Sequence, residues 1–255
     1  MYRFIWLKDL KGAVHTWKGL VWLLVTALIF SATSYLFLTN KELSLLDQTE
    51  MLWLLGKVII GAALLVVVID ASSLITAEFE NETIESLLLS PLTLGSFVLG
   101  KLLAALTVWL LIYAAAVPYM IVTAAGSELT GPFLVYVALF GTLAVLGFTL
   151  LVFAVSIFYR SLKNTLTTSL VVLLALALPA LFSPVLKTSV LARIAGVANP
   201  LDSIFAGLDN VLVDYHTALG ANLGFLIPVV VFCLLALGLL VLAVRTFNRR
   251  GIVKD

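Results

Sequence analysis

The chain has 255 residues, of which 62% are hydrophobic and only 11% are charged, and its mean hydropathy is +1.18. A soluble core of this length cannot bury so much apolar surface, so the composition excludes a soluble globular domain and indicates a polytopic membrane protein. The formal net charge of +1 indicates no class of partner. The single cysteine, Cys233, excludes a disulfide framework and a cysteine-based metal site.

Residues 1–19 have the pattern of an amphipathic helix that lies in the membrane interface. At about 100° per residue, one face carries basic and polar side chains, those of Lys8, Lys11, His15 and Lys18. The opposite face carries aromatic and aliphatic side chains, those of Tyr2, Trp6, Leu10, Ala13, Trp17 and Leu20. We expect this helix to anchor the topology, and contact with a cytoplasmic partner is compatible with that role.

Six apolar segments follow that are long enough to cross a bilayer as helices. They are approximately 20–38, 51–76, 102–125, 133–158, 165–186 and 224–244. Alternation with period two is absent, so we predict a single all-α transmembrane domain over residues 1–255 with six spans. Several glycines in the later spans permit close helix contacts, namely Gly141, Gly147, Gly224 and Gly238.

Lysine and arginine residues near the span ends predict the orientation. With six spans, ten of them fall on one side, namely Arg3, Lys8, Lys11, Lys18, Arg160, Lys163, Arg245, Arg249, Arg250 and Lys254. The other side has Lys41, Lys187 and Arg193. Because basic residues concentrate in cytoplasmic segments, both termini are predicted to be cytoplasmic, in the inner or plasma membrane of the cell.

The external segment 187–223 is long and not very polar. Asn199-Pro200 predicts a turn, and Asp202 is the expected N-cap of a following helix that contains Ile204, Leu208 and Val211. We expect one or two short helices on or in the outer leaflet, with a structural cap and a gate both open as roles.

The connector 77–95 contains the densest charge cluster of the chain. Glu78, Glu82 and Glu85 form an acidic stripe at helical spacing, with an apolar patch on another side made of Ile84, Leu87 and Leu88. Pro91 ends the helix. This pattern predicts a short amphipathic helix that docks a cytoplasmic protein; the alternative is a solvated charged loop.

The run ITAEFENETIESLLLSPLTLGSFVLGKLLA resembles the first cytoplasmic loop of ABC-2 type transporter permeases. That loop has a pattern close to E-x-E-x-G-T-[LI]-E-x-L-L-x-x-P-[LI] and an LGK-like return into span three. The matching residues are Glu78, Glu80, Thr83, Ile84, Glu85, Leu87, Leu88, Pro91, Leu92, Leu99, Gly100 and Lys101. Glu82 replaces the usual glycine, and Phe79 replaces a residue that is commonly basic.

The resemblance implies an ATP-driven transporter, usually an exporter, whose permease loop docks on an ATPase subunit. The implied docking residues are Glu78, Glu80, Glu82, Thr83, Ile84, Glu85, Leu87, Leu88 and Pro91. The chain has no G-x-x-x-x-G-K-[ST] phosphate loop, so ATP and Mg would be bound by a separate subunit and this chain would be neither an enzyme nor a cofactor protein. A second permease copy, identical or different, and the lipid bilayer are the other expected partners; nucleic acid is not.

Charged residues inside spans are candidates for function. Asp70 and Lys101 lie near the cytoplasmic ends of spans two and three, where they could pair, snorkel to the interface, or serve a substrate or proton. Lys57 is expected to snorkel at the outer end of span two. The main alternative function is a secondary transporter coupled to protons or sodium, which would be expected to show paired intramembrane carboxylates or broken helices in matching halves.

A membrane enzyme is disfavoured by the positions of the histidines. His15 and His216 fall on opposite sides of the membrane in this topology, so they cannot share a metal site. No histidine lies within a predicted span, where a protease of the bilayer would need one. We therefore expect no catalytic residue and no metal ligand on this chain.

Overall fold

Seven α-helices make up the part of the chain that the computed structural model describes, residues 6, 17–39, 47–81, 94–181 and 199–251. They are α2 (Trp17–Thr39), α3 (Gln48–Glu80), α5 (Leu94–Thr123), α6 (Thr130–Tyr159), α7 (Leu162–Leu181), α9 (Pro200–Leu212) and α10 (Leu219–Gly251). All except α9 are long and apolar enough to cross a membrane. The predicted all-α fold with six spans is therefore confirmed.

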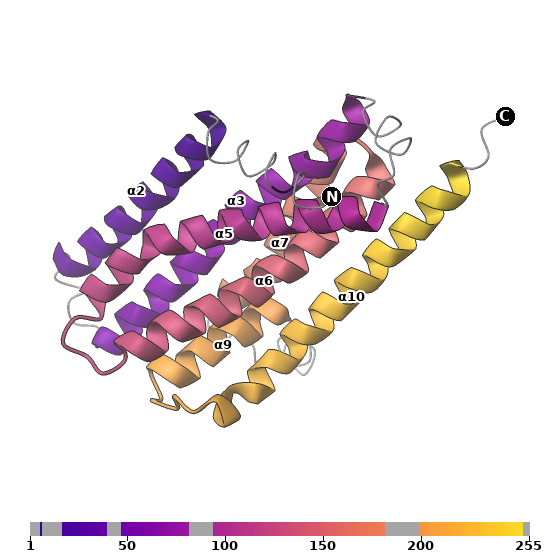
Figure 1. The fold of residues 1–255 in the computed structure, drawn as a ribbon. Coiled ribbons are helices and arrows are strands. Elements are labelled where there is room, and N and C mark those ends of the chain that lie inside the picture. Colours follow the sequence, from indigo (N-terminus) through magenta and orange to yellow (C-terminus); the bar gives the residue numbers. More distant parts are fainter. Residues whose placement is uncertain (1–5, 7–16, 40–46, 82–93, 182–198, 252–255) are drawn as a thin grey trace.

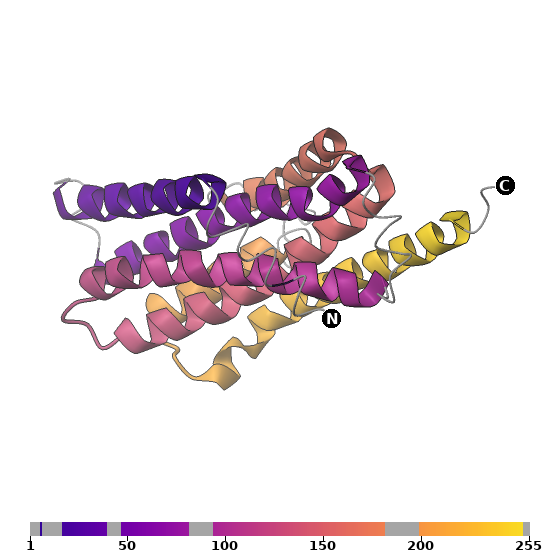
Figure 2. The ribbon, with the colours of Figure 1, turned by 45° about the horizontal axis from the view of Figure 1, so that its top comes forward.

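The long helices form one bundle with α6 at its centre (Figure 1). α6 packs against α3, α5, α7, α9 and α10, whereas α2 packs only on the side of α3 and α5. Figures 1 and 2 both show α2 and α10 at opposite edges of the bundle. Because the long helices alternate in direction, the start of α2, the end of α3, the α6–α7 turn and the end of α10 gather at one end, which we call the terminal end. The other end, which holds α9, is called the α9 end.

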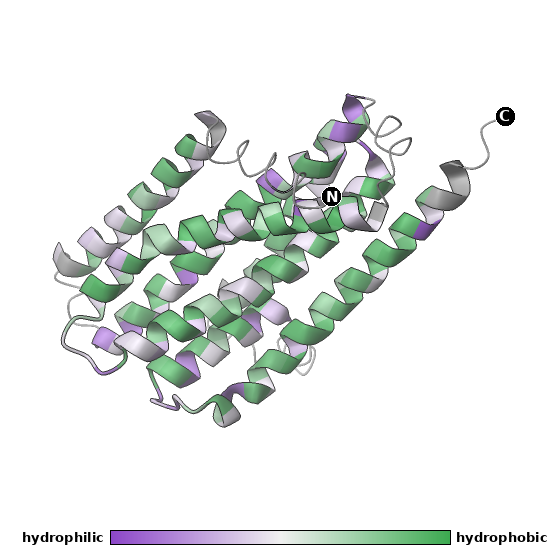
Figure 3. Cartoon of the chain, in the orientation of Figure 1, coloured by the Kyte–Doolittle hydropathy of each residue, from purple (hydrophilic) through white to green (hydrophobic). Residues whose placement is uncertain are grey.

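Burial differs strongly between the helices. α3 and α6 are mostly buried, and the largest fully buried side chains of the bundle include Trp109, Phe133, Phe140, Phe148 and Phe153. α2, α7 and α10 instead expose apolar side chains such as Leu28, Leu178 and Leu234. Hydrophobic residues cover the lengths of the helices and hydrophilic ones concentrate toward the two ends (Figure 3). This is the distribution that contact with lipid requires, because the bilayer interior solvates no polar group.

Most of the helices are longer than the spans predicted from hydropathy; α7 begins at Leu162 instead of 165 and is described as far as Leu181. α3 has 33 residues, from Gln48 to Glu80, where the apolar run predicts 51–76. α5 begins at Leu94 instead of 102, and α10 extends from Leu219 to Gly251 instead of 224–244. Hydropathy detects only the lipid-facing part, about 20 residues, whereas the backbone stays helical as long as residues such as Ala and Glu favour it. The connector between α6 and α7 is correspondingly shorter than predicted, residues 160–161 instead of 159–164.

The helix predicted after Asn199 is present, but its cap is a different residue. The Asn199 side chain accepts a hydrogen bond from the Leu201 N–H at 3.0 Å, and Pro200 is the first helical residue. The prediction that Asp202 caps this helix is wrong, because Asn199 has the extended backbone of an N-cap and proline fits the first position of a helix. Asp202 lies in the first turn instead, where a carboxylate is favoured by the helix dipole.

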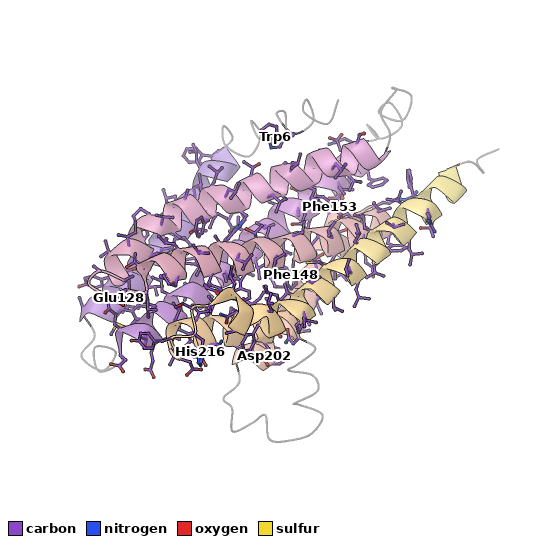
Figure 4. All side chains as sticks on the ribbon, turned by 60° about the horizontal axis from the view of Figure 1, so that its bottom comes forward. Trp6, Glu128, Phe148, Phe153, Asp202 and His216 are labelled. Carbon is purple, nitrogen blue, oxygen red and sulfur yellow. The ribbon has the colours of Figure 1, made fainter. Side chains whose placement is uncertain are left out.

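The predicted interfacial helix, residues 1–19, lies largely outside the described residues. Within it the structure describes Trp6, whose indole Nε1 donates a hydrogen bond to Thr107 Oγ1 of α5 at 3.0 Å. Figure 4 shows Trp6 beside this helix. Trp17 already belongs to α2. Trp6, one of the residues on the predicted apolar face, therefore contacts the membrane helices.

Candidate functional site

The last turn of α3 carries three consecutive side chains that each contact a different part of the bundle. We call these residues, Glu78, Phe79 and Glu80, the α3 junction. They lie at the terminal end, and the helix stops directly after them, where the Asn81 N–H donates to the Ala77 carbonyl at 3.0 Å. The junction is thus the last point of α3 before the predicted docking loop.

Glu78 links α3 to α5. Its Oε1 lies 3.1 Å from Lys101 Nζ, and the two side chains are only 14% and 4% exposed. The Lys101 ammonium also lies 5.3 Å from the ring centroid of Phe97. Two opposite charges that are both largely withdrawn from water attract each other more strongly than they would at the surface. The pair therefore clasps the end of α3 to the first turns of α5.

Phe79 faces the opposite side, toward α10 and the turn between α6 and α7. Its ring meets Phe247 of α10 edge-on, with centroids 5.8 Å apart. The Arg160 guanidinium lies 5.1 Å from the Phe247 centroid and 5.7 Å from that of Phe79. A cation over the faces of two aromatic rings is attracted by both ring quadrupoles. Phe79 thereby joins three helix ends through one aromatic and cationic cluster.

Arg160 holds this position with a left-handed backbone. It caps the C-terminus of α6 with φ of 52°, and its N–H donates to the Ser156 carbonyl at 2.9 Å. This conformation is usual for glycine and unfavourable for other residues. Glycine would relieve the strain, so the presence of arginine indicates that its contacts with Phe79 and Phe247 offset the cost of this backbone conformation.

Glu80 contacts the start of α7. Its Oε1 accepts a hydrogen bond from the backbone N–H of Leu162 at 2.8 Å, and Leu162 is the first residue of that helix. The first N–H groups of a helix have no partner within the helix, and a carboxylate there also interacts favourably with the helix dipole. Glu80 therefore supplies, from α3, a partner that α7 needs for its first turn.

The predicted docking residues divide into two groups. Glu78 and Glu80 are in α3 and contact other helices, as described above. The others lie outside the described residues, namely Glu82, Thr83, Ile84, Glu85, Leu87, Leu88 and Pro91, so their helix and their docking role stay predictions. Lys101 contacts Glu78, which is eight residues beyond Asp70 in α3, or about 12 Å along the helix. The predicted pair of Lys101 with Asp70 also stays a prediction.

Sequence reasoning missed the partners that complete the α3 junction. Arg160 was used only as a basic residue for orientation, and neither Leu162 nor Phe247 was singled out. All three residues lie more than 80 positions along the chain from the α3 residues that they contact. Contacts of this kind depend on how the helices pack, and they leave no local pattern.

A protein-family comparison identifies the chain. The family model described as ABC-2 family transporter protein matches residues 3–252. The chain belongs to this family. Its resemblance to ABC-2 permeases is thereby confirmed over nearly its full length, and the protein is a multi-pass membrane permease and not itself a catalyst. No curated protein matches the chain significantly.

At the α9 end of the permease, a polar network holds the connector between α9 and α10. The buried Asn222 amide donates to the His216 carbonyl at 2.7 Å and to the Tyr136 hydroxyl of α6 at 3.1 Å. Its oxygen accepts from the Asn210 amide of α9 at 2.9 Å. Figure 4 shows His216 at this end. Because the network joins α6, α9 and α10, it fixes the connector between them.

Lys57 belongs to the same end and takes part in packing α9. Its ammonium lies 3.3 Å from the Trp53 ring centroid and 5.4 Å from that of Phe205 in α9. The Trp53 indole N–H donates to the Phe205 carbonyl at 2.9 Å. The sequence predicts that Lys57 snorkels to the interface, which stays a prediction. In the structure its ammonium lies over aromatic rings, where the cation–π attraction helps to hold α9 against α3.

We expect Asp209→Asn to stabilise the permease at neutral pH. The pKa of Asp209 is raised above its ordinary value of 3.8, mainly by burial and also by the negative charges of Asp214 and Glu50. The positive charge of Lys57 opposes this shift. A carboxyl with a raised folded-state pKa holds its proton more tightly in the folded protein, so the wild type gains stability as pH falls. The advantage of the variant should be greatest above that folded-state pKa and shrink as pH approaches 3.8. Thermal unfolding in detergent across this range measures it, and an advantage that grows as pH falls would contradict the assignment.

Proposed function

We propose that the chain is the permease subunit of an ATP-binding cassette exporter in the cell membrane, driven by a separate ATPase subunit that docks on residues 77–91. ATP and Mg would be bound by that subunit. A second permease copy, identical or different, would complete the transport unit, since six spans are half of what the family resemblance implies. The transported substrate is a question for experiment.

The observation that carries this proposal is the continuity of α3 from the membrane into the loop motif. α3 runs without a break from Gln48 to Glu80, and Glu78 and Glu80 are the first two residues of the motif that the resemblance assigns to docking. A force applied to the loop would therefore act on a rigid helix. The ion pair between Glu78 and Lys101 and the hydrogen bond from Leu162 to Glu80 would transmit this force to α5 and α7.

The distribution of basic residues supports a cytoplasmic location of the terminal end. Arg160, Lys163 and Arg245 all lie at this end of the described chain, and basic residues near span ends concentrate on the cytoplasmic side. An ATPase subunit that uses cytoplasmic ATP would meet the loop there. Both termini would share this side, because the number of spans is even.

The docking proposal is tested by purifying the tagged permease from its native membrane in mild detergent. We expect an ATPase with a Walker phosphate loop to co-purify with the wild type. Replacing Ile84, Leu87 and Leu88 together by glutamate should remove it, because three charges in an apolar contact surface cannot be desolvated without a large penalty. Quantitative mass spectrometry measures the ratio of the two subunits.

The matched control keeps the same three positions apolar. Ile84→Leu, Leu87→Met and Leu88→Met together conserve volume and hydropathy, so this variant should retain the ATPase. If no such ATPase accompanies the wild type at native expression, the proposal is wrong, and the effect of Asp70→Asn on proton-coupled transport becomes the next experiment. Loss of the ATPase from both triple variants would place the docking surface elsewhere.

A further inference from the structure

The α3 junction reaches α7 and α10 through two different side chains. Glu80 reaches the first backbone N–H of α7, whereas Phe79 reaches α10 through Phe247. Both α7 and α10 pack against the central helix α6. They are also among the least buried of the spans.

We propose that the α3 junction is a branch point that passes movement of the docking loop to α7 and to α10 independently, through Glu80 and Phe79 respectively. The proposal rests on the proposed function, because it needs an ATPase that moves the loop. It deepens that function by assigning positioning roles to residues outside the docking loop: Leu162, Arg160 and Phe247.

The branch to α7 is short and directional. One hydrogen bond of 2.8 Å joins the carboxylate of Glu80 to the N–H of Leu162, and a charged acceptor makes such a bond stronger than a neutral one. The only residues between α6 and α7 are Arg160 and Ser161, so α7 can respond to a displacement of Glu80 at its very first turn. A displacement along α3 would shift the N-terminus of α7.

The branch to α10 uses a different kind of contact. Phe79 and Phe247 meet edge-on at 5.8 Å, and the Arg160 guanidinium lies within 5.7 Å of both ring centroids. The left-handed backbone of Arg160 aims that side chain at the rings, at a cost that a glycine would avoid. The strain is explained if the cation holds α10 to the junction while the loop moves.

Two substitutions cut one branch each and leave every glutamate of the loop in place. Leu162→Pro removes the N–H that Glu80 binds, at the first helical position, where proline is well tolerated. Phe247→Leu removes the ring that Phe79 and Arg160 contact but keeps an apolar side chain. The matched controls are Leu162→Ala, which keeps the N–H, and Phe247→Tyr, which keeps the ring.

The measurement is the distance between pairs of spin labels in the permease–ATPase complex, reconstituted in lipid nanodiscs. Val135 of α6 is labelled together with Leu178 of α7 in one sample and with Ile227 of α10 in another, because all three are exposed. The native cysteine is removed by Cys233→Ser. Pulsed electron paramagnetic resonance compares the nucleotide-free complex with the complex trapped by ATP and vanadate.

In the wild type and both controls, trapping should change both distances by about 2 Å, the scale of helix shifts in switching proteins. Leu162→Pro should abolish the change at α7 and retain that at α10, and Phe247→Leu should do the reverse. The branch point is refuted if both variants retain both changes, if either variant loses both while the ATPase stays bound, or if the wild type shows neither change. Failure of the ATPase to bind the wild type would instead refute the proposed function.

Discussion

Glu78→Gln is expected to lower the free energy of unfolding of the permease by about 3–5 kcal/mol, the usual cost of removing one partner of a buried ion pair. The reason is the position of Lys101, whose side chain is only 4% exposed and whose Nζ lies 3.1 Å from the Glu78 carboxylate. Glutamine has nearly the same shape but no charge, so the buried ammonium loses the attraction of the carboxylate that lies 3.1 Å away. Equilibrium unfolding in mixed micelles measures the loss.

The double variant Glu78→Met/Lys101→Met provides the control for this prediction. Replacing both charges by apolar side chains of similar length removes the desolvation penalty together with the attraction, so its stability should lie close to that of the wild type. The wild type, Glu78→Met, Lys101→Met and this double variant form a double-mutant cycle that isolates the coupling between the two residues. A loss below about 1 kcal/mol for Glu78→Gln would show that solvent screens the pair, as it does for surface salt bridges.

The spans could be predicted because each one carries its own signal. A run of about 20 apolar residues identifies a membrane helix without knowledge of its neighbours, and all six runs are helices in the structure. Their ends could not be predicted as well, because polar residues such as Glu78 and Glu80 continue α3 beyond its apolar part. Hydropathy therefore locates the spans in the sequence but underestimates the length of a helix such as α3.

The candidate site was predictable only where a local motif marks it. The glutamate-rich run includes Glu78 and Glu80, but its helical spacing does not indicate that Glu78 is largely buried against Lys101. The partners Arg160, Leu162 and Phe247 come from two other regions of the chain. What brings them together is the crossing of α3, α7 and α10 at the terminal end, which no stretch of sequence encodes by itself.

The glycines of the later spans also show that the sequence does not reveal which residues pack closely. The sequence identifies Gly141, Gly147, Gly224 and Gly238 alike as points of close helix contact. A Cβ added at Gly141 or Gly147 would collide with Trp109 or Phe232, whereas one added at Gly224 or Gly238 would meet nothing within 4 Å. Of these four glycines, the two in close contact are those of α6, the helix with neighbours on most sides, and α6 has this position only in the folded bundle.

Gly141→Ala is accordingly expected to destabilise the permease by about 3 kcal/mol, at the upper end of the usual cost of overpacking. The new Cβ would lie 2.5 Å from Cη2 of Trp109, a fully buried ring whose Nε1 donates to Thr142 Oγ1 at 3.0 Å. The ring is rigid and bonded in place, so α5 and α6 would have to separate. Thermal unfolding in detergent measures the loss.

The control for this effect is Gly61→Ala in α3, where an added Cβ meets nothing within 4 Å. It should be neutral or stabilising by about 0.5–1 kcal/mol, because alanine favours a helix over glycine. Trp109→Phe replaces the ring that causes the collision by a smaller one. Its loss of stability should therefore be smaller in the Gly141→Ala background than in the wild type. Equal costs in the two backgrounds would mean that Trp109 does not set the distance between α5 and α6, and that the glycine is needed for another contact of the central helix.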